Sequence, residues 1–120
     1  MTRLTWLGHS TVLIELNGIR LLTDPVLRSR VAHLRRHGPM PRHFGLIDAV
    51  LVSHIHYDHL DLPSLRMLQS TPRVVCPAGA KPVLGDGYRA VAELRPGESL
   101  ELGELTIEAT PAEHLSLIHI

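Results

Sequence analysis

The chain of 120 residues fits one domain or a part of a larger one, and its 44% apolar content is ordinary for a protein with a hydrophobic core. Its 12 basic and 12 acidic residues balance, which argues against a general polyanion binder, so no nucleic-acid partner is expected. The single cysteine, Cys76, excludes an internal disulfide, and we expect it to pack as a small hydrophobe. No apolar stretch has the length of a signal peptide or a membrane span, so a soluble, cytoplasmic protein is the expectation.

Strand signals dominate the first quarter of the chain. Apolar and β-branched residues predict strands over 4–7 and 11–16. Asn17-Gly18 is a hairpin signal, because both positions of a type I′ turn take positive φ. The return strand is expected over 19–23, where Asp24-Pro25 stops it.

The stretch from Arg28 to Phe44 has no clear periodicity and predicts a long loop. From Arg28 to Arg42 it carries five arginines and no acidic residue. A solvated loop is the plain interpretation, and a rim that attracts anionic substrates is the alternative. The histidines of this stretch are expected to face solvent rather than a metal; they are His33, His37 and His43.

The remaining chain predicts short strands and a few short helices. Ala49–Val52 is wholly apolar, which fits a strand buried on both faces, and the residues after such a strand point into a crevice. A short helix is predicted over 63–69, with Asp61 as its cap and Pro63 in its first turn. Further strands are predicted at 74–76, 90–94, 99–102 and 105–110, a weak helix at 78–84, and turns at 95–97 and 103–104. Together these elements predict an α/β layered domain.

The stretch SHIHYDHLD, residues 53–61, gathers three histidines and two aspartates directly after the buried strand. His54 and His56 lie two apart, so in an extended segment they project to the same side and can hold a borderline-soft cation such as zinc. Asp58 and His59 follow at once and make a reasonable start to a second metal site. Two cations ~3.5–4 Å apart can share a hydroxide that attacks a carbonyl or phosphoryl centre. A purely structural use is the weaker alternative, because four of the six positions from His54 to His59 carry metal-competent groups.

The pattern H-x-H-x-D-H after an apolar strand resembles the signature of the metallo-β-lactamase-fold hydrolases. Two further stretches, TWLGHSTVL at 5–13 and LTDP at 22–25, precede it in order. Together the three stretches resemble the branch that contains ascorbate-6-phosphate lactonase and the N-acyl phosphatidylethanolamine-hydrolysing phospholipase D. The likeness covers nearly the whole chain, and it identifies the superfamily much more strongly than it identifies a substrate.

The resemblance implies a role for each matching position. His54 and His56 would bind the first metal, and His114, which follows a predicted strand and a proline, would be its third ligand. Asp58 and His59 would bind the second metal, and Asp58 would also act in catalysis by orienting the attacking water. The implied cofactor is zinc, as one or two ions, with manganese or iron as alternatives.

Other polar residues near the motif receive more limited roles. Asp24 is expected to accept an imidazole N–H from a metal ligand and so to fix its tautomer, with a cap of a helix or turn as the alternative. His9, between the first two strands, either faces the pocket or makes a structural hydrogen bond. Tyr57 is expected to pack rather than to touch the metal.

The resemblance also implies a fold, the four-layered αββα sandwich of two similar halves, of which this chain matches the N-terminal half. The other half would supply an aspartate that bridges both metals and a last histidine. Residues 1–120 are therefore expected to be a truncated metallo-β-lactamase-fold domain with one sheet face or edge uncovered, which favours aggregation. Residues 115–120, LSLIHI, match one translation frame of a transposon-end adapter used for sequencing libraries, so this tail is expected to be non-native.

The leading functional hypothesis is a metal-dependent hydrolase in which a metal-bound hydroxide cleaves a lactone, ester or phosphodiester of an anionic small molecule. A nuclease of the same fold ranks lower, because the region around His114 resembles the lactonase and phospholipase branch. The alternatives are an inactive metal-binding fragment of such an enzyme and a mononuclear iron oxygenase of the same fold. The diiron oxygenases of this fold typically carry glutamate where this chain has His56, so the histidine argues against a diiron site and leaves a mononuclear iron site open. A homo-oligomeric state is left open.

Overall fold

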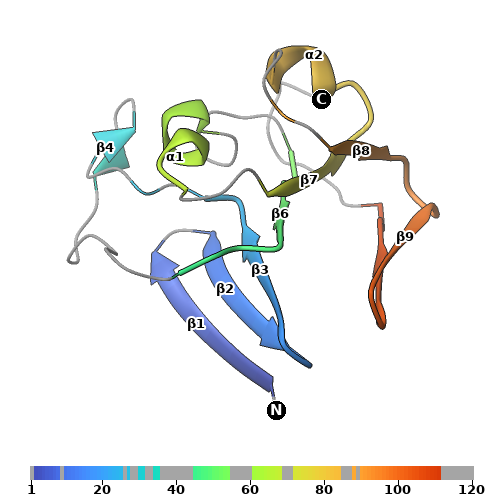
Figure 1. The fold of residues 1–120 in the computed structure, drawn as a ribbon. Coiled ribbons are helices and arrows are strands. Elements are labelled where there is room, and N and C mark those ends of the chain that lie inside the picture. The colour runs from blue at the N-terminus through green and yellow to red at the C-terminus, as the bar shows by residue number, and fades with distance from the viewer. Residues whose placement is uncertain are drawn as a thin grey trace.

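The computed structural model consists of short strands and short helices (Figure 1). The described residues are 2–8, 10–25, 27, 30–31, 34–35, 45–54, 61–68, 72–84, 88 and 90–111. The strands among them are β1 (Thr2–Gly8), β2 (Thr11–Leu16), β3 (Ile19–Thr23), β4 (Arg30–Val31), β5 (Leu34–Arg35), β6 (Ala49–Leu51), β7 (Arg73–Pro77), β8 (Val91–Leu94), β9 (Ser99–Leu102) and β10 (Leu105–Glu108). The described helices are α1 (Leu62–Arg66) and α2 (Lys81–Leu84), and none in this part of the chain is long and apolar enough to cross a membrane.

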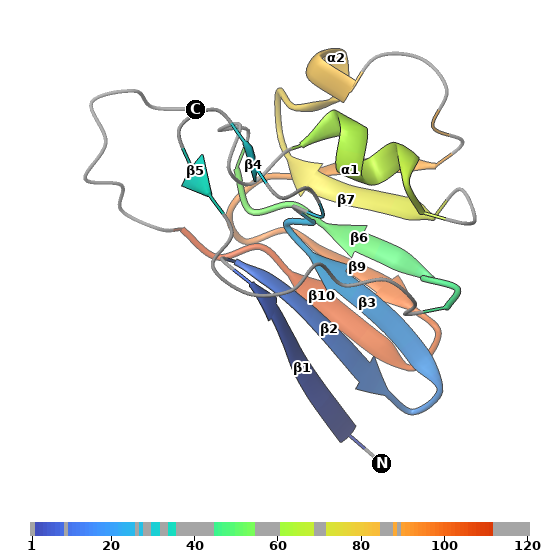
Figure 2. The ribbon, with the colours of Figure 1, turned by 90° about the vertical axis from the view of Figure 1, so that its left-hand side faces the viewer.

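A mixed sheet of six strands, in the order β1-β2-β3-β6-β7-β8, forms the centre of the molecule (Figure 2). Strands β1, β2 and β3 pair antiparallel, whereas β3, β6, β7 and β8 pair parallel. Parallel neighbours need a crossover, and α1 and α2 lie in the crossovers that follow β6 and β7. The predicted α/β layered arrangement is therefore confirmed, and β3 and β6 end at the same edge of the sheet.

The hairpin between β2 and β3 has the turn that the sequence predicts. Asn17 has a φ of 49° and Gly18 a φ of 80°, so both residues adopt the left-handed conformation of a type I′ turn. Leu16 then pairs with Ile19. This register places Leu13 opposite Leu22, so both leucines lie on the same face of the sheet.

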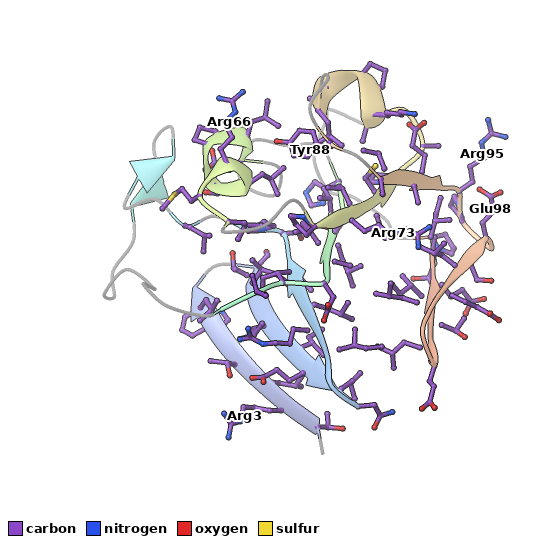
Figure 3. All side chains as sticks on the ribbon, viewed as in Figure 1. Arg3, Arg66, Arg73, Tyr88, Arg95 and Glu98 are labelled. Atoms are coloured by element: carbon purple, nitrogen blue, oxygen red, sulfur yellow. The ribbon has the colours of Figure 1, made fainter. Side chains whose placement is uncertain are left out.

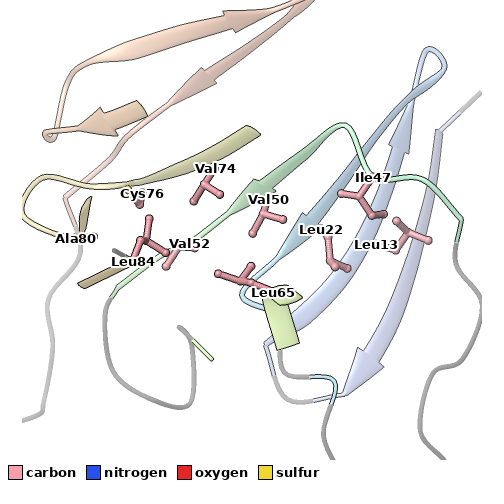
Figure 4. Packing of buried hydrophobic residues seen from close by; sticks show 10 residues of the cluster. All are labelled: Leu13, Leu22, Ile47, Val50, Val52, Leu65, Val74, Cys76, Ala80 and Leu84. Atoms are coloured by element: carbon pink, nitrogen blue, oxygen red, sulfur yellow. The ribbon is translucent and has the colours of Figure 1, made fainter. Parts of the chain in front are cut away.

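The hydrophobic core lies between this face and the two helices (Figure 4). Leu22, Val50 and Val74 sit side by side in the registers of β3, β6 and β7, and all three are fully buried. Burying a side chain of this kind stabilises the fold by about 1.5–3 kcal/mol. Leu65 of α1 and Leu84 of α2 cover the row from the helix side. The other members of the buried cluster are Leu13, Ile47, Val52, Ala80 and Cys76, the last of which packs as the predicted small hydrophobe.

The hairpin of β9 and β10 lies on the opposite face of the sheet from the helices (Figures 1 and 2). Its turn passes close to β3, because a Cβ built at Gly103 would lie 2.9 Å from Cδ1 of Ile19. The predicted turn before the hairpin is present as well. Glu98 Oε1 accepts the N–H of Arg95 at 2.6 Å there, and Figure 3 shows both side chains at this corner.

Two expectations about secondary structure are wrong in part. The stretch 28–44, predicted as a loop, contains the two-residue strands β4 and β5, which pair with each other. A strand of two residues is too short to show a period, so sequence pattern cannot reveal it. Asp61 does precede α1, but its side chain makes no hydrogen bond to the helix backbone and accepts the hydroxyl of Ser64 instead.

Candidate functional site

The ends of β3 and β6 bring Asp24 next to the first residues of SHIHYDHLD. The N–H of Asp24 donates to the carbonyl of Leu51 at 2.8 Å, and the N–H of Val52 donates to the carbonyl of Val75 at 2.8 Å. These bonds continue the parallel ladder beyond the last paired residues of β3 and β6. The chain therefore enters the histidine motif from a fixed position at the carboxyl edge of the sheet, where ligands bind in open α/β sheets.

Asp24 is held in an unusual backbone conformation. Its φ is 36°, in the left-handed region that few residues other than glycine adopt, and aspartate is among those that tolerate it. Its carbonyl accepts the hydroxyl of Thr11 at 2.8 Å, in addition to the bond between its N–H and Leu51. Asp24 and Thr11 are 4% and 0% exposed. Both backbone groups of Asp24 are therefore fixed.

The carboxylate of Asp24 binds Ser53, the residue before the first histidine. Oδ1 accepts the backbone N–H of Ser53 at 2.6 Å, and Oδ2 accepts its hydroxyl at 2.6 Å. The same hydroxyl oxygen lies 2.9 Å from Nδ1 of His54. Hydrogen bonds to a carboxylate are about twice as strong as those between neutral groups. A chain of contacts thus connects a buried carboxylate with the imidazole of a candidate metal ligand.

This arrangement modifies the role predicted for Asp24. The sequence suggested that its carboxylate accepts an imidazole N–H directly, whereas the route to His54 that the structure describes runs through Ser53. Sequence reasoning missed Ser53, although its place immediately before His54 in SHIHYDHLD was visible. Serine often follows a strand, so its position in the sequence alone predicts no role. The role becomes visible only in the structure, where Asp24, the residue after β3, binds Ser53.

Thr23 connects the loop before β2 to β3. Its hydroxyl donates to the carbonyl of Ser10 at 2.8 Å and accepts the N–H of Val12 at 2.9 Å. The backbone is thereby held on both sides of Thr11, whose hydroxyl supports Asp24. The loop that follows β1 is therefore part of the support of the site.

A second polar cluster holds the other end of the motif. Ser64 of α1 accepts the N–H of Leu27 at 2.7 Å, and its hydroxyl donates to the carboxylate of Asp61. Ser64 and Asp61 are both buried, and Asp61 is the last residue of SHIHYDHLD. Since Ser53 binds Asp24 at the first residue of the motif, the segment from Asp24 to Leu27 is attached to both ends of the motif.

The structure places one of the five predicted metal ligands, the half-buried His54. The other predicted ligands lie outside the described residues; they are His56, Asp58, His59 and His114. The same holds for His9, His33, His37, His43 and Tyr57. Within the described part of the chain, no three histidine, cysteine, aspartate or glutamate side chains form a group that could hold a metal ion.

Comparison with known proteins gives one matching family. Residues 19–119 match the family described as the beta-lactamase superfamily domain. An uncharacterised protein of Mycobacterium tuberculosis is 36% identical over 125 residues, which cover 93% of this chain and 34% of that protein. The N-acyl-phosphatidylethanolamine-hydrolyzing phospholipase D 1 of Caenorhabditis elegans is 35% identical over 92% of this chain and 37% of its own length. A UPF0173 metal-dependent hydrolase of Opitutus terrae is 34% identical over 98% of this chain and 50% of its own length.

Solved structures share the fold. The metallo hydrolase Igni18 of Ignicoccus hospitalis superimposes with a TM-score of 0.67 at 22% identity, over 97% of this chain and 51% of that one. The diiron β-hydroxylase CmlA of Streptomyces venezuelae superimposes with a TM-score of 0.64 at 26% identity, over 92% of this chain and 24% of that one. The chain thus spans a third to a half of the length of the curated relatives, from 34% to 50% in the three described above.

Proposed function

Because this chain belongs to the metallo-β-lactamase superfamily, we propose that it carries the first metal-binding motif of a metal-dependent hydrolase. The bond cleaved is a lactone, an ester or a phosphodiester. The observation that supports the proposal best is the hydrogen-bonded attachment of His54, through Ser53, to the buried Asp24. Histidines that ligate metals almost always donate their other ring N–H to a partner, and the contact at Nδ1 gives the ring of His54 such a partner.

The proposed ligand set is the one that the sequence predicts. His54, His56 and His114 would hold the first metal, and Asp58 and His59 the second. Neutral imidazole and carboxylate groups suit zinc, and they also accept manganese or iron. When bound, such a cation lowers the pKa of a coordinated water, so that a nucleophile exists near neutral pH.

His54 is the one proposed ligand whose fit to a metal the described residues can test. Nδ1 of its ring lies 2.9 Å from the hydroxyl of Ser53, so this nitrogen already serves a protein contact. A metal-bound histidine coordinates through one ring nitrogen while the other serves a protein contact, so the contact at Nδ1 of the half-buried His54 is compatible with coordination through Nε2. The donor chemistry of His54 therefore fits the role.

Some residues of this chain hold the proposed metal site in place, and Asp58 would take part in the reaction. Asp24 and Ser53 hold His54, while Ser64 and Asp61 hold the far end of the motif on α1. Asp58 is proposed to accept a hydrogen bond from the attacking water and so to direct a lone pair at the substrate. A carboxylate suits this role because, when ionised, it can only accept hydrogen bonds.

An anionic substrate is proposed on two grounds. The stretch from Arg28 to Arg42 carries five arginines and no acidic residue, so it would attract a negatively charged group. The relative from Caenorhabditis elegans is named for hydrolysing a phospholipid, which contains a phosphodiester. A small molecule with a phosphate or carboxylate group is the substrate class that we propose, and the expected cytoplasmic location stays a prediction.

A mononuclear iron oxygenase is the second candidate, because an iron enzyme that hydroxylates, the diiron β-hydroxylase of Streptomyces venezuelae, shares the fold at 26% identity, while His56 argues against the diiron kind. The inactive metal-binding fragment is the third, since the chain spans only part of the length of its relatives. Metal analysis with an absorption spectrum separates the first two, because zinc protein is colourless and iron protein absorbs. Assays against lactone and phosphodiester substrates separate an enzyme from an inactive fragment.

The metal site can be tested by comparing histidine variants. Zinc content and zinc affinity would be measured for the purified protein and for the variants His54→Gln, His56→Gln and His43→Gln. We expect the first two variants to lose tight binding and His43→Gln to retain it, because His43 belongs to the group of histidines that the sequence predicts to face solvent. Equal losses in all three variants would show that the histidines bind zinc non-specifically, and the proposed function would then be wrong.

A further inference from the structure

We propose that Ser53 is a positioning residue that sets the tautomer of His54, by passing a hydrogen bond from the carboxylate of Asp24 to Nδ1 of the imidazole. The inference deepens the proposed function and rests on it, because the consequence for metal binding requires His54 to be a ligand. The tautomer itself is a property of the metal-free protein and can be measured without any metal.

The direction of the hydrogen bonds follows from counting protons. The hydroxyl of Ser53 has a single proton, and an ionised carboxylate can only accept, so the 2.6 Å contact with Oδ2 of Asp24 uses that proton. The 2.9 Å contact between the hydroxyl oxygen and Nδ1 of His54 then requires the ring to donate. A neutral imidazole with its proton on Nδ1 has its lone pair on Nε2, and this is the form that coordinates a metal through Nε2.

The carboxylate cannot easily turn to change this pattern. Oδ1 of Asp24 accepts the backbone N–H of Ser53 at 2.6 Å, so Oδ2 must face the hydroxyl. The backbone of Asp24 is held by bonds to Leu51 and Thr11, at a φ of 36°. The side chain is therefore oriented by the fold rather than by His54.

This geometry makes Asp24→Asn an informative substitution. The amide oxygen must still face the N–H of Ser53, so the amide NH₂ faces the hydroxyl and donates to it. The hydroxyl then turns its own proton toward Nδ1 of His54. The favoured tautomer becomes the one that is protonated on Nε2, which cannot coordinate a metal there. A substitution that changes a single group thus reverses the polarity of the whole chain of contacts.

A purely structural role predicts a different result. If Asp24 and Ser53 only hold the backbone, then asparagine, which has the same shape and keeps the bond to the N–H of Ser53, should change little. Ser53→Ala removes the hydroxyl and retains the backbone bond, and Ser53→Thr retains both. Since Ser53 is exposed, these two variants are expected to fold even if Asp24→Asn does not.

The experiment reads the tautomer directly. Long-range ¹H–¹⁵N NMR of the ¹⁵N-labelled, metal-free protein at about pH 8, where histidine is neutral, distinguishes the two protonated nitrogens. The signals of His54 are assigned by their loss in His54→Gln. We expect protonation on Nδ1 in the wild type and in Ser53→Thr, on Nε2 in Asp24→Asn, and a mixture in Ser53→Ala. Wild-type His54 protonated on Nε2, or the same tautomer in Ser53→Ala as in the wild type, would overturn the proposal.

Zinc affinity, measured by competition with a chelator, gives the second readout. Asp24→Asn is expected to weaken binding about 10–100-fold, as is usual for partners of metal ligands. In a Ser53→Ala background the same change should add no further loss, because the hydroxyl that transmits it is absent. An undiminished effect there would overturn the proposal. Wild-type protein that binds no zinc, with His54 protonated on Nδ1, would contradict the proposed function and leave the role of Ser53 intact.

Discussion

Two buried hydroxyl groups hold the backbone segment that supports the candidate metal site. Thr11 and Ser64 are both 0% exposed, and each hydroxyl forms a hydrogen bond with a backbone group of the segment from Asp24 to Leu27. A buried polar group must find a partner, because leaving it unpaired is costly. These short side chains therefore place the segment more accurately than apolar packing could.

Replacing Thr11 by valine tests this support. Thr11→Val keeps the shape of the side chain but removes the hydroxyl that donates to the carbonyl of Asp24. We expect the free energy of unfolding to fall by about 1–3 kcal/mol, the usual effect of losing one partner of a buried hydrogen bond. Urea unfolding measures the change, with Thr11→Ser as the control that keeps the hydroxyl. A loss in the serine variant as large as that in the valine variant would point to packing instead.

The thiol of Cys76 provides a prediction about pH. Burial, with a smaller contribution from Glu93 and a partly opposing one from Lys81, raises the pKa of the Cys76 thiol from 9.0 to about 11. Between these values the unfolded state binds fewer protons than the folded state, so stability falls as the pH rises through this range. Below it, the contribution of the thiol is fully present and constant.

Two measurements check this prediction. The folded protein should react slowly with a thiol reagent near neutral pH, because the thiol is both buried and protonated. The stability difference between the wild type and Cys76→Ala should be constant up to about pH 9 and shrink above it. Fast labelling of the folded protein under conditions that do not unfold it would contradict the raised pKa.

Turns control which face of each element is buried. Asn17-Gly18 sets the register of β2 against β3, and a shift by one residue would put Leu13 and Leu22 on opposite faces of the sheet. Patterns of this kind are local, so the strands 11–16, 19–23 and 99–102 were predicted to the residue, while the strand predicted at 4–7 extends from Thr2 to Gly8. The short pair β4–β5 was not predicted, because pairing between two-residue strands depends on the neighbouring chain rather than on a pattern.

Two glycines with positive φ allow the cost of backbone strain to be distinguished from the cost of a close contact between two elements. Gly18, at a φ of 80°, has open space where a Cβ would be, so Gly18→Ala should cost only about 1–2 kcal/mol of conformational strain. Gly103, at a φ of 60°, would place its Cβ 2.9 Å from Cδ1 of Ile19. Thermal unfolding should therefore show a modestly larger loss for Gly103→Ala than for Gly18→Ala, because Cδ1 is the far end of a flexible side chain and must move aside.

Shortening Ile19 provides the matched control for Gly103. In an Ile19→Val background, which removes Cδ1, Gly103→Ala should lose no more stability than Gly18→Ala does. An equal loss from Gly103→Ala in both backgrounds would mean that the turn of the β9–β10 hairpin does not press on β3. The comparison thus tests how the hairpin is placed on the sheet.

At the scale of the whole molecule, the part of the chain that the structure describes has exposed apolar side chains on one face of the sheet. Leu4 and Trp6 alternate with residues that face the core, and they are 67% and 72% exposed. They lie on the edge strand β1, on the face opposite the helices, beyond the part near β3 that the β9–β10 hairpin approaches. An apolar face along a sheet edge promotes association, so the aggregation liability expected from the sequence stays a prediction that can be tested here.

Substitutions on this face should change association without changing the fold. We expect Leu4→Thr combined with Trp6→Thr to lower concentration-dependent association, as measured by sedimentation velocity. Threonine suits a strand, and both side chains are exposed, so the free energy of unfolding should change little. Val83→Thr on α2, also at an exposed apolar position, is the control and should leave association unchanged. A similar effect from the control would show that association does not depend on this face.

The sequence by itself determined most of the strands of this protein and the composition of its motif. Apolar alternation, turn residues and the composition of SHIHYDHLD are local properties, so the positions of these strands along the chain and the choice of His54 as a candidate ligand followed from the chain alone. The predicted roles of His56, Asp58, His59 and His114 still depend on that local pattern and on family membership.

The tertiary structure alone decided which groups support the site. Asp24 is hydrogen-bonded to Ser53, which lies 29 positions away in the sequence, and Ser64 is hydrogen-bonded to Leu27, which lies 37 positions away. The parallel pairing of β3 with β6 and the packing of α1 bring these segments together. Hydrogen bonds depend on direction and distance in space, and no local pattern encodes either across so many residues. The bond from Asp24 to the imidazole of a metal ligand stays a prediction, and only the fold could place a serine hydroxyl between Asp24 and His54.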